Sequence, residues 1–165
     1  MRCKVHYEWL IGRWLINSDG GTGAATFVIW LWSDIQNSET MVDWFLDEIA
    51  RAAKGELRAV ETYDLIDLEP NDNPYFLGTG NSMSCWANSK FFYIECEYVG
   101  EWRVIMTIDQ VREALGHYRL FTLGSWDDPQ TTPEPFEYEY IAEEVEATKL
   151  AIEAGLISSD SEEVS

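Results

Sequence analysis

The segments with strand-like composition come in pairs, and each pair is joined by a short turn. Residues 3–17 and 25–32 are rich in β-favouring residues, and the polar, glycine-rich residues 17–23 separate them. Phe91–Tyr98 and Trp102–Thr107 form a second pair. Tight turns join antiparallel strands, whereas parallel strands need long crossovers. The pairing therefore predicts two hairpins in a mostly antiparallel sheet, and the unbroken apolar run within 25–32 predicts a central strand covered on both faces.

Two longer segments show the apolar periodicity of amphipathic helices. In residues 40–54, apolar side chains recur every three or four positions after a capping Ser38 or Thr40, and Gly55 ends the pattern. Residues 136–154 show the same spacing. Shorter elements fill the rest: a strand at 57–68, a long loop at 69–90, a short helix at 110–115 ended by Gly116, a last strand at 118–123 and a linker at 126–135.

These elements predict an α+β fold. It consists of a mostly antiparallel sheet of about five or six strands, with one packed helix and a C-terminal helix. We expect one domain over residues 1–155, because a chain of 165 residues with 46% hydrophobic residues can bury one sizeable core. Residues 156–165 are acidic and rich in Ser, which predicts a disordered tail.

The negative charge is concentrated in two stretches. The formal net charge is −19, and residues 61–72 and 126–165 together carry 16 of these charges, whereas the first 33 residues have a net charge of +1. A strong field of one sign affects association more than it affects the fold. It favours a basic partner and disfavours nucleic acid or an anionic membrane. No segment has the uncharged length of a membrane span, and three cysteines are too few for a disulfide scaffold, so we expect a cytoplasmic protein.

No catalytic or metal-binding signature stands out. His6 and His117 have no nucleophile or second ligand nearby in the sequence, and the position of His117 just after Gly116 suits the negative end of a helix. Cys85 lies in the predicted long loop without a neighbouring base that would activate it. Asp67 begins a stretch similar to a calcium loop, but Asp72 stands where that loop needs Gly. We therefore predict no enzyme activity, no metal and no cofactor.

Aromatic residues lie beside the acidic stretches, which favours a role for these stretches in binding. An acidic cluster at 61–72 lies next to an aromatic loop that contains Tyr75, Phe76 and Trp86, and the polar face of the 91–98 strand carries further carboxylates. Surfaces that mix carboxylates and aromatic rings on a rigid scaffold suit the capture of a cationic partner. The predicted partner-binding residues are Asp64, Asp67, Glu69, Asp72, Tyr75, Trp86, Glu95 and Glu97.

In these general features the chain resembles bacterial toxin-immunity proteins, which accompany contact-dependent inhibition systems and other polymorphic toxins. The resemblance implies a dedicated inhibitor of one cognate toxin, typically a nuclease, whose basic phosphate-binding surface an acidic inhibitor can occupy. Three alternatives stay open. A nucleic-acid mimic (an anti-restriction or anti-CRISPR protein) would place carboxylates in rows, an enzyme would show a carboxyl group of shifted pKa near His6 or His117, and an oligomerising protein would show an apolar self-interface. The oligomeric state is not predicted.

Overall fold

The structure, a computed structural model, describes residues 1–36, 38–56, 73–124 and 126–159. In these residues the chain is α+β, as predicted, with four α-helices and two antiparallel sheets. The strands span Arg2–Leu10 (β1), Arg13–Ser18 (β2), Phe76–Thr79 (β3), Met83–Ala87 (β4), Phe91–Cys96 (β5), Arg103–Thr107 (β6), Glu137–Glu139 (β7) and Ala142–Glu143 (β8). The helices span Thr22–Ile29 (α1), Glu39–Ala53 (α2), Ile108–Leu123 (α3) and Glu144–Glu153 (α4), and a π-helix, η1, spans Trp30–Ile35.

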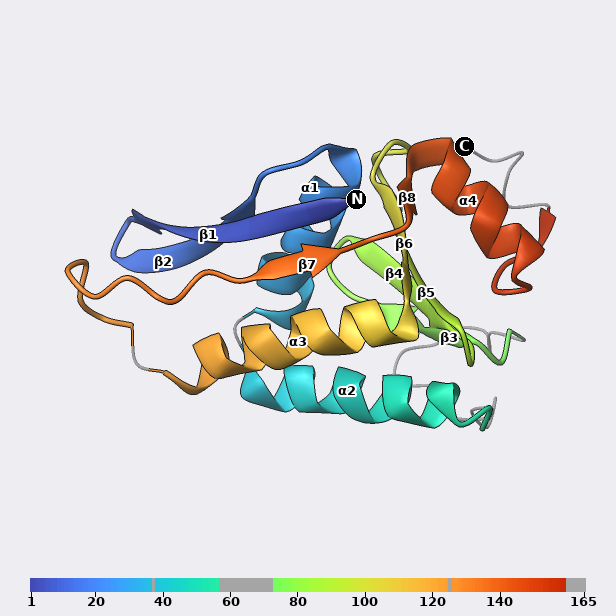
Figure 1. Cartoon of the computed structure of the whole chain (residues 1–165), viewed down its shortest axis with the longest axis horizontal. Helices are drawn as coiled ribbons and strands as arrows, with labels where there is room; N and C mark the ends of the chain where they lie inside the picture. The colour runs from blue at the N-terminus through green and yellow to red at the C-terminus, as the bar shows by residue number, and fades with distance from the viewer. Residues whose placement is uncertain (37, 57–72, 125, 160–165) are drawn as a thin grey trace.

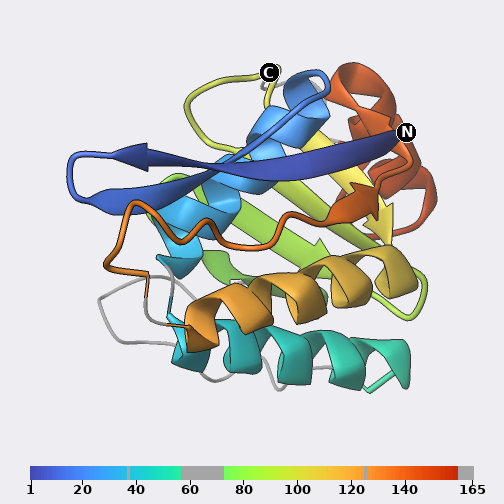
Figure 2. The same cartoon turned by 60° about the vertical axis from the view of Figure 1, so that its left-hand side comes forward.

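The elements form layers around a central helix. One sheet has the strand order β2-β1-β7, and the other has the order β3-β4-β5-β6-β8. Helix α1 contacts β2 of the first sheet and β5 and β6 of the second, so it lies between them (Figure 1). Helices α2 and α3 lie side by side, below the smaller sheet and next to one end of the larger sheet, and α4 packs on β5 and β6 at the far side of the larger sheet (Figures 1 and 2).

The prediction of a strand at 25–32 is wrong, because these residues form most of α1 and the start of η1. A helix enclosed between two sheets is apolar on all sides, so it lacks the 3.6-residue period and resembles a buried strand in sequence. The first hairpin turn is therefore not at 17–23. It lies within the predicted first strand at Ile11 and Gly12, where β1 and β2 pair directly.

The glycine-rich residues before α1 allow the helix to begin in a crowded place. Gly21 is the N-cap residue, and the backbone N–H of Gly23 donates to Glu143 Oε1 at 3.0 Å. A Cβ atom on Gly23 would lie only 2.8 Å from side-chain atoms of both Tyr140 and Glu143. Only glycine fits this close approach between the start of α1 and the segment that carries β8.

The helix predicted at 40–54 is confirmed as α2, but α3 is longer than predicted. Ser38 caps α2 by accepting a hydrogen bond from Met41 N at 3.2 Å. Helix α3 begins at a capping box between Thr107 and Gln110 and continues through Gly116 to Leu123. The predicted strand at 118–123 is therefore wrong. The apolar stripe of α3 continues across Gly116, and burial of that stripe against the core outweighs the weak helix propensity of glycine.

The hairpin predicted around residue 100 is confirmed as β5 and β6. The predicted long loop at 69–90 contains a further hairpin, in which β3 pairs with β4 and β4 pairs with β5. Cys85 consequently lies on a strand and is buried, not exposed in a loop. The strand predicted at 57–68 and the first residues of that loop lie outside the described residues.

The C-terminal helix exists, but it is shorter than predicted. Residues 137–143 form β7 and β8, and only Glu144–Glu153 form α4. Tertiary pairing of β7 with β1 explains the difference, because Phe136, Tyr138 and Tyr140 are buried in alternation with exposed residues. Packing also continues past residue 155, where we placed the end of the domain, since Leu156 and Ile157 are buried. Residues 160–165 of the predicted tail lie outside the described residues.

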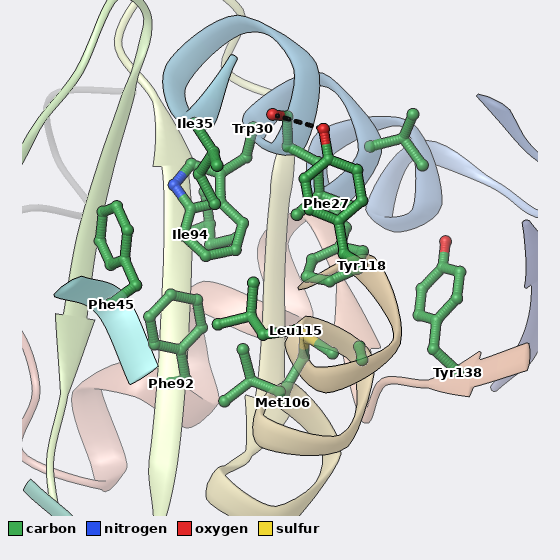
Figure 3. Close-up of a cluster of buried hydrophobic side chains, with 14 of the residues drawn as sticks. Phe27, Trp30, Ile35, Phe45, Phe92, Ile94, Met106, Leu115, Tyr118 and Tyr138 are labelled. Atoms are coloured by element: carbon green, nitrogen blue, oxygen red, sulfur yellow. Dashed lines mark hydrogen bonds between the residues drawn. The ribbon is translucent and has the colours of Figure 1, made fainter. Parts of the chain in front are cut away.

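Two apolar clusters cover the two faces of the larger sheet. In the main cluster, the fully buried Trp30 of η1 packs against Phe27, Phe45 and Phe92, with ring centroids 5.0–5.8 Å apart (Figure 3). Tyr118 of α3 donates to the backbone carbonyl of Leu31 at 3.4 Å and so joins α3 to the π-helix (Figure 3). The smaller cluster lies under α4 and contains Tyr93, Ile105, Ala147, Ala151, Leu156 and Ile157.

Candidate functional site

Four of the predicted partner-binding residues lie outside the described part of the chain. Asp64, Asp67, Glu69 and Asp72 all fall within residues 57–72. Their predicted role stays a prediction.

The structure brings three of the other predicted residues to one face of the larger sheet. Trp86 pairs with Tyr93, and Ser84 pairs with Glu95, across β4 and β5. Ser84 Oγ donates to Glu97 Oε1 at 3.5 Å, which places Glu97 on the same side. Tyr75 comes just before β3 and packs against the cluster under α4. The predicted residues therefore gather on the side of the sheet that α4 partly covers.

This face is less open than the sequence predicts. Tyr93 is fully buried under α4, and Trp86 is half-buried, with its ring 5.6 Å from that of Tyr93. The Glu95 side chain is 21% exposed and lies 3.6 Å from the guanidinium of Arg103, which is buried. Burial raises the pKa of Glu95, and the nearby Arg103 opposes that rise. Alternation of residues along a strand predicts which side chains share a face, but not which element covers it.

A polar network under α4 occupies part of the same face. Arg103 Nη1 donates to Thr148 Oγ1 of α4 at 2.6 Å, and the hydroxyl of Tyr93 lies 3.0 Å from the same oxygen. Because these buried contacts join α4 to the sheet, Glu95 and Arg103 contribute to the fold. Glu97 is the exposed carboxylate of this face among the described predicted residues.

A second candidate, which we call the α3 groove, runs between α3 and residues 134–137. It encloses about 820 Å³. Its rings come from both walls: His117 stacks on Phe136 at 5.3 Å, and Trp126 stacks on Phe121 at 5.8 Å. The backbone N–H of Val5 donates to the carbonyl of Phe136 at 2.8 Å, which holds the second wall against β1.

His117 has a different setting from the one predicted. Because α3 continues to Leu123, His117 lies within the helix, and the dipole at the end of a helix does not explain it. Its side chain instead lines the α3 groove. The periodicity of α3 through Gly116 was the sequence signal that would have placed it there.

The charged residues of the α3 groove come from three elements. Glu113 lies on α3, and Glu134 and Glu137 lie on the opposite wall. Arg2 of β1 also lines the groove, but it forms ion pairs with Glu137 at 2.7 Å and with Glu139 at 3.3 Å. Lys4 is the other base in the lining. Glu113 and Glu134 therefore give the groove a carboxylate on each wall, beside its aromatic rings.

The described residues contain no group of three or more His, Cys, Asp or Glu side chains placed to hold a metal ion. Their three cysteines are free and buried, and burial raises the pKa of the Cys85 thiol. None of the described helices has the length and apolar character needed to cross a membrane. In comparisons with known proteins, no family model, no curated protein and no solved structure matches this chain.

Proposed function

We propose that this protein binds and neutralises a basic protein, as a toxin-immunity protein does, and that the α3 groove is part of the surface that the partner contacts. The observation that supports this most directly is the groove itself, which combines aromatic rings from both walls with Glu113 and Glu134 on opposite walls. Protein interfaces commonly combine aromatic or apolar anchors at the centre with a polar rim.

The exposed apolar residues of α3 also favour a protein partner. Leu120 lines the groove and is 67% exposed, and Leu123, one turn further, is 50% exposed. A partner would bury these side chains and gain free energy from their removal from water. An enzyme is less well supported, because in the described part of the chain the two carboxyl groups whose pKa burial raises, Asp34 and Glu95, do not line the groove of His117.

The net charge of −19 favours a basic partner. A toxin that cleaves nucleic acid needs a basic surface to hold phosphates, and an acidic inhibitor would be steered towards that surface. Such an inhibitor acts in the compartment where the toxin would do harm, so we expect it in the cytoplasm. It needs no cofactor for this role.

The test uses the protein encoded next to this chain's gene. The purified neighbour and this chain are mixed in a stopped-flow instrument, and protection is scored by growth when both are expressed in one cell. Leu120→Ser should speed dissociation about tenfold, because it removes an exposed apolar anchor and tenfold corresponds to about 1.4 kcal/mol. The double variant Glu113→Gln, Glu134→Gln should slow association several-fold at low salt and have little effect near 1 M salt, where screening is strong.

A matched control carries Val145→Ser and Glu146→Gln on α4, which are exposed and do not line the groove. It should leave both rates unchanged. A second experiment neutralises Asp64, Asp67, Glu69 and Asp72 together and measures the association rate. If the groove variants bind like wild type and the four-acid variant associates slowly, the interface lies at residues 61–72 instead. If the neighbour neither binds nor is toxic, the immunity function is wrong.

A further inference from the structure

A separate small pocket lies between η1, α2 and the β3–β4 hairpin, and we call it the Asp34 slot. It encloses about 160 Å³ and shares no lining residue with the α3 groove. Pockets for drug-sized ligands usually enclose roughly 300–1,000 Å³, so this slot suits a single side chain. Its lining is mainly apolar and aromatic and includes Trp30, Met41, Trp44, Phe45 and Met83, with Asp34 as its carboxylate.

One oxygen of the Asp34 carboxylate lacks a hydrogen-bond partner among the described residues. Its Oδ2 accepts a hydrogen bond from the backbone N–H of Met83 at 3.1 Å. Its Oδ1 is buried and has no hydrogen-bond partner among the described residues. Burial raises the pKa of Asp34, and hydrogen bonds from the backbone N–H groups of the β3–β4 turn and from the Ser33 side chain oppose that rise. A buried carboxylate oxygen without a donor is costly, and because Asp34 lines the slot, a donor that enters the slot and reaches this carboxylate would gain free energy.

The backbone around Asp34 departs from regular structure at several points. Asp34 lies in the π-helix η1, a rare element that occurs frequently at functional sites, and Gln36 ends that helix with a φ of 57°. Gly78 of the facing hairpin has a φ of +139°. A Cβ atom on Gly80 would collide with the Asp34 carboxylate, so only glycine fits there. Of these features, the π-helix is the one that most often accompanies a functional site.

The lining favours a donor that carries a positive charge. A charged donor makes a stronger hydrogen bond to a carboxylate than a neutral donor does. The ring of Trp44, which lines the slot, can also attract a cation to its face. The apolar residues would accommodate an aliphatic stem. We propose that the Asp34 slot takes the side chain of one lysine or arginine of a partner protein.

The inference that the Asp34 slot prefers a cation depends only on the geometry of the slot. Only the identification of that cation as a side chain of the partner rests on the proposed function. A test with small cations and no partner therefore separates the two. Binding is measured by NMR from the backbone amide signals of Gly78 and Gly80, which line the slot. The probes are N-acetyl-lysine methylamide, N-acetyl-arginine methylamide, the uncharged N-acetyl-norleucine methylamide and the free diamine putrescine.

We expect saturable binding of the lysine or arginine derivative with a Kd of about 1 mM, and binding of the norleucine derivative at least tenfold weaker. Asp34→Asn should weaken cation binding at least tenfold, and Trp44→Ala should weaken it about fivefold. Asp47→Asn, an exposed control on α2, should bind like wild type. The melting temperature of each variant shows that it is folded, and Trp44→Ala tests the slot without altering the carboxylate.

Four results would overturn the proposal. If no probe binds up to about 50-fold above the expected Kd, the slot is not a cation site. Equal binding of the norleucine derivative would show a merely apolar cavity. Unchanged cation binding to both Asp34→Asn and Trp44→Ala would place the bound cation elsewhere. Tighter binding of putrescine than of either amino-acid derivative would assign the slot to free polyamines and not to a protein side chain.

Discussion

Replacing Ile11 by Asn should make the protein more stable. Ile11 and Gly12 are the two residues between β1 and β2, and their φ angles are +51° and +79°. Positive φ at both positions is typical of the type I′ hairpin turn, for which Asn-Gly is a preferred sequence. A side chain other than glycine in the left-handed region costs about 1–2 kcal/mol, and Asn tolerates that region better than a β-branched residue does. Because the Ile11 side chain is fully exposed, the substitution removes no buried contact.

The net gain should be about 1 kcal/mol, which in a domain of this size corresponds to a rise in Tm of about 2–4 °C. Thermal and urea unfolding of the wild type and of Ile11→Asn measure it. Ile11→Val keeps the strain and should leave Tm unchanged, whereas Gly12→Ala should lower Tm because its φ is also positive. An unchanged or lower Tm for Ile11→Asn would show that residue 11 is not left-handed or that its side chain is packed.

Three further predictions concern stability. Gly116→Ala should raise the free energy of unfolding by about 1 kcal/mol, because Gly116 lies within α3 and the new Cβ would meet no atom within 4 Å beyond its chain neighbours and the backbone of its own helix. A loss of stability in urea unfolding would mean that the helix ends there. Deleting residues 160–165 should leave the urea midpoint unchanged. A chain ending at Gly155 also lacks the buried Leu156 and Ile157, so its free energy of unfolding should fall by about 3 kcal/mol or more. Equal effects of the two deletions would contradict the packing of Leu156 and Ile157. Asp34→Asn should be more stable than wild type at pH 7. Folding raises the pKa of Asp34 above 3.8, so the folded state holds the proton more tightly and the wild type loses stability as the pH rises through the raised pKa. The difference in stability between Asp34→Asn and the wild type should therefore vanish near pH 3, and a difference that does not depend on pH would show that the charge of Asp34 is not its cause.

An amphipathic helix and a hairpin with a short turn were the most predictable parts of the fold. Helix α2 has a buried apolar stripe and a solvent-exposed side, and a short turn joins β5 to β6. In both cases the local sequence pattern agrees with the tertiary environment of the element. In two other segments the correct pattern was present but was interpreted wrongly. The alternation from Phe136 to Tyr140 has a period of two, and the stripe of α3 continues through Gly116.

Helix α1 could not have been predicted from local pattern. It is enclosed by two sheets that include strands far away in the sequence, so every side of it is apolar and no periodicity remains to be detected. The Asp34 slot is hidden for the same reason, because η1 continues α1 and meets the β3–β4 hairpin only after folding. Gly78 and Gly80 were its visible signals, and both are equally typical of an ordinary turn.

The acidic C-terminal stretch now divides into carboxylates that support the fold and carboxylates that are available to a partner. Glu143 Oε1 accepts hydrogen bonds from the Tyr140 hydroxyl at 2.6 Å and from Gly23 N at 3.0 Å, so it holds the start of α1 against β8. Glu137 forms its ion pair with Arg2 across β7 and β1. Glu134, by contrast, is exposed in the α3 groove. The net charge of the stretch therefore overstates the charge that it offers to a partner, and a variant that neutralised all its acids together would confuse loss of binding with loss of the contact between α1 and β8.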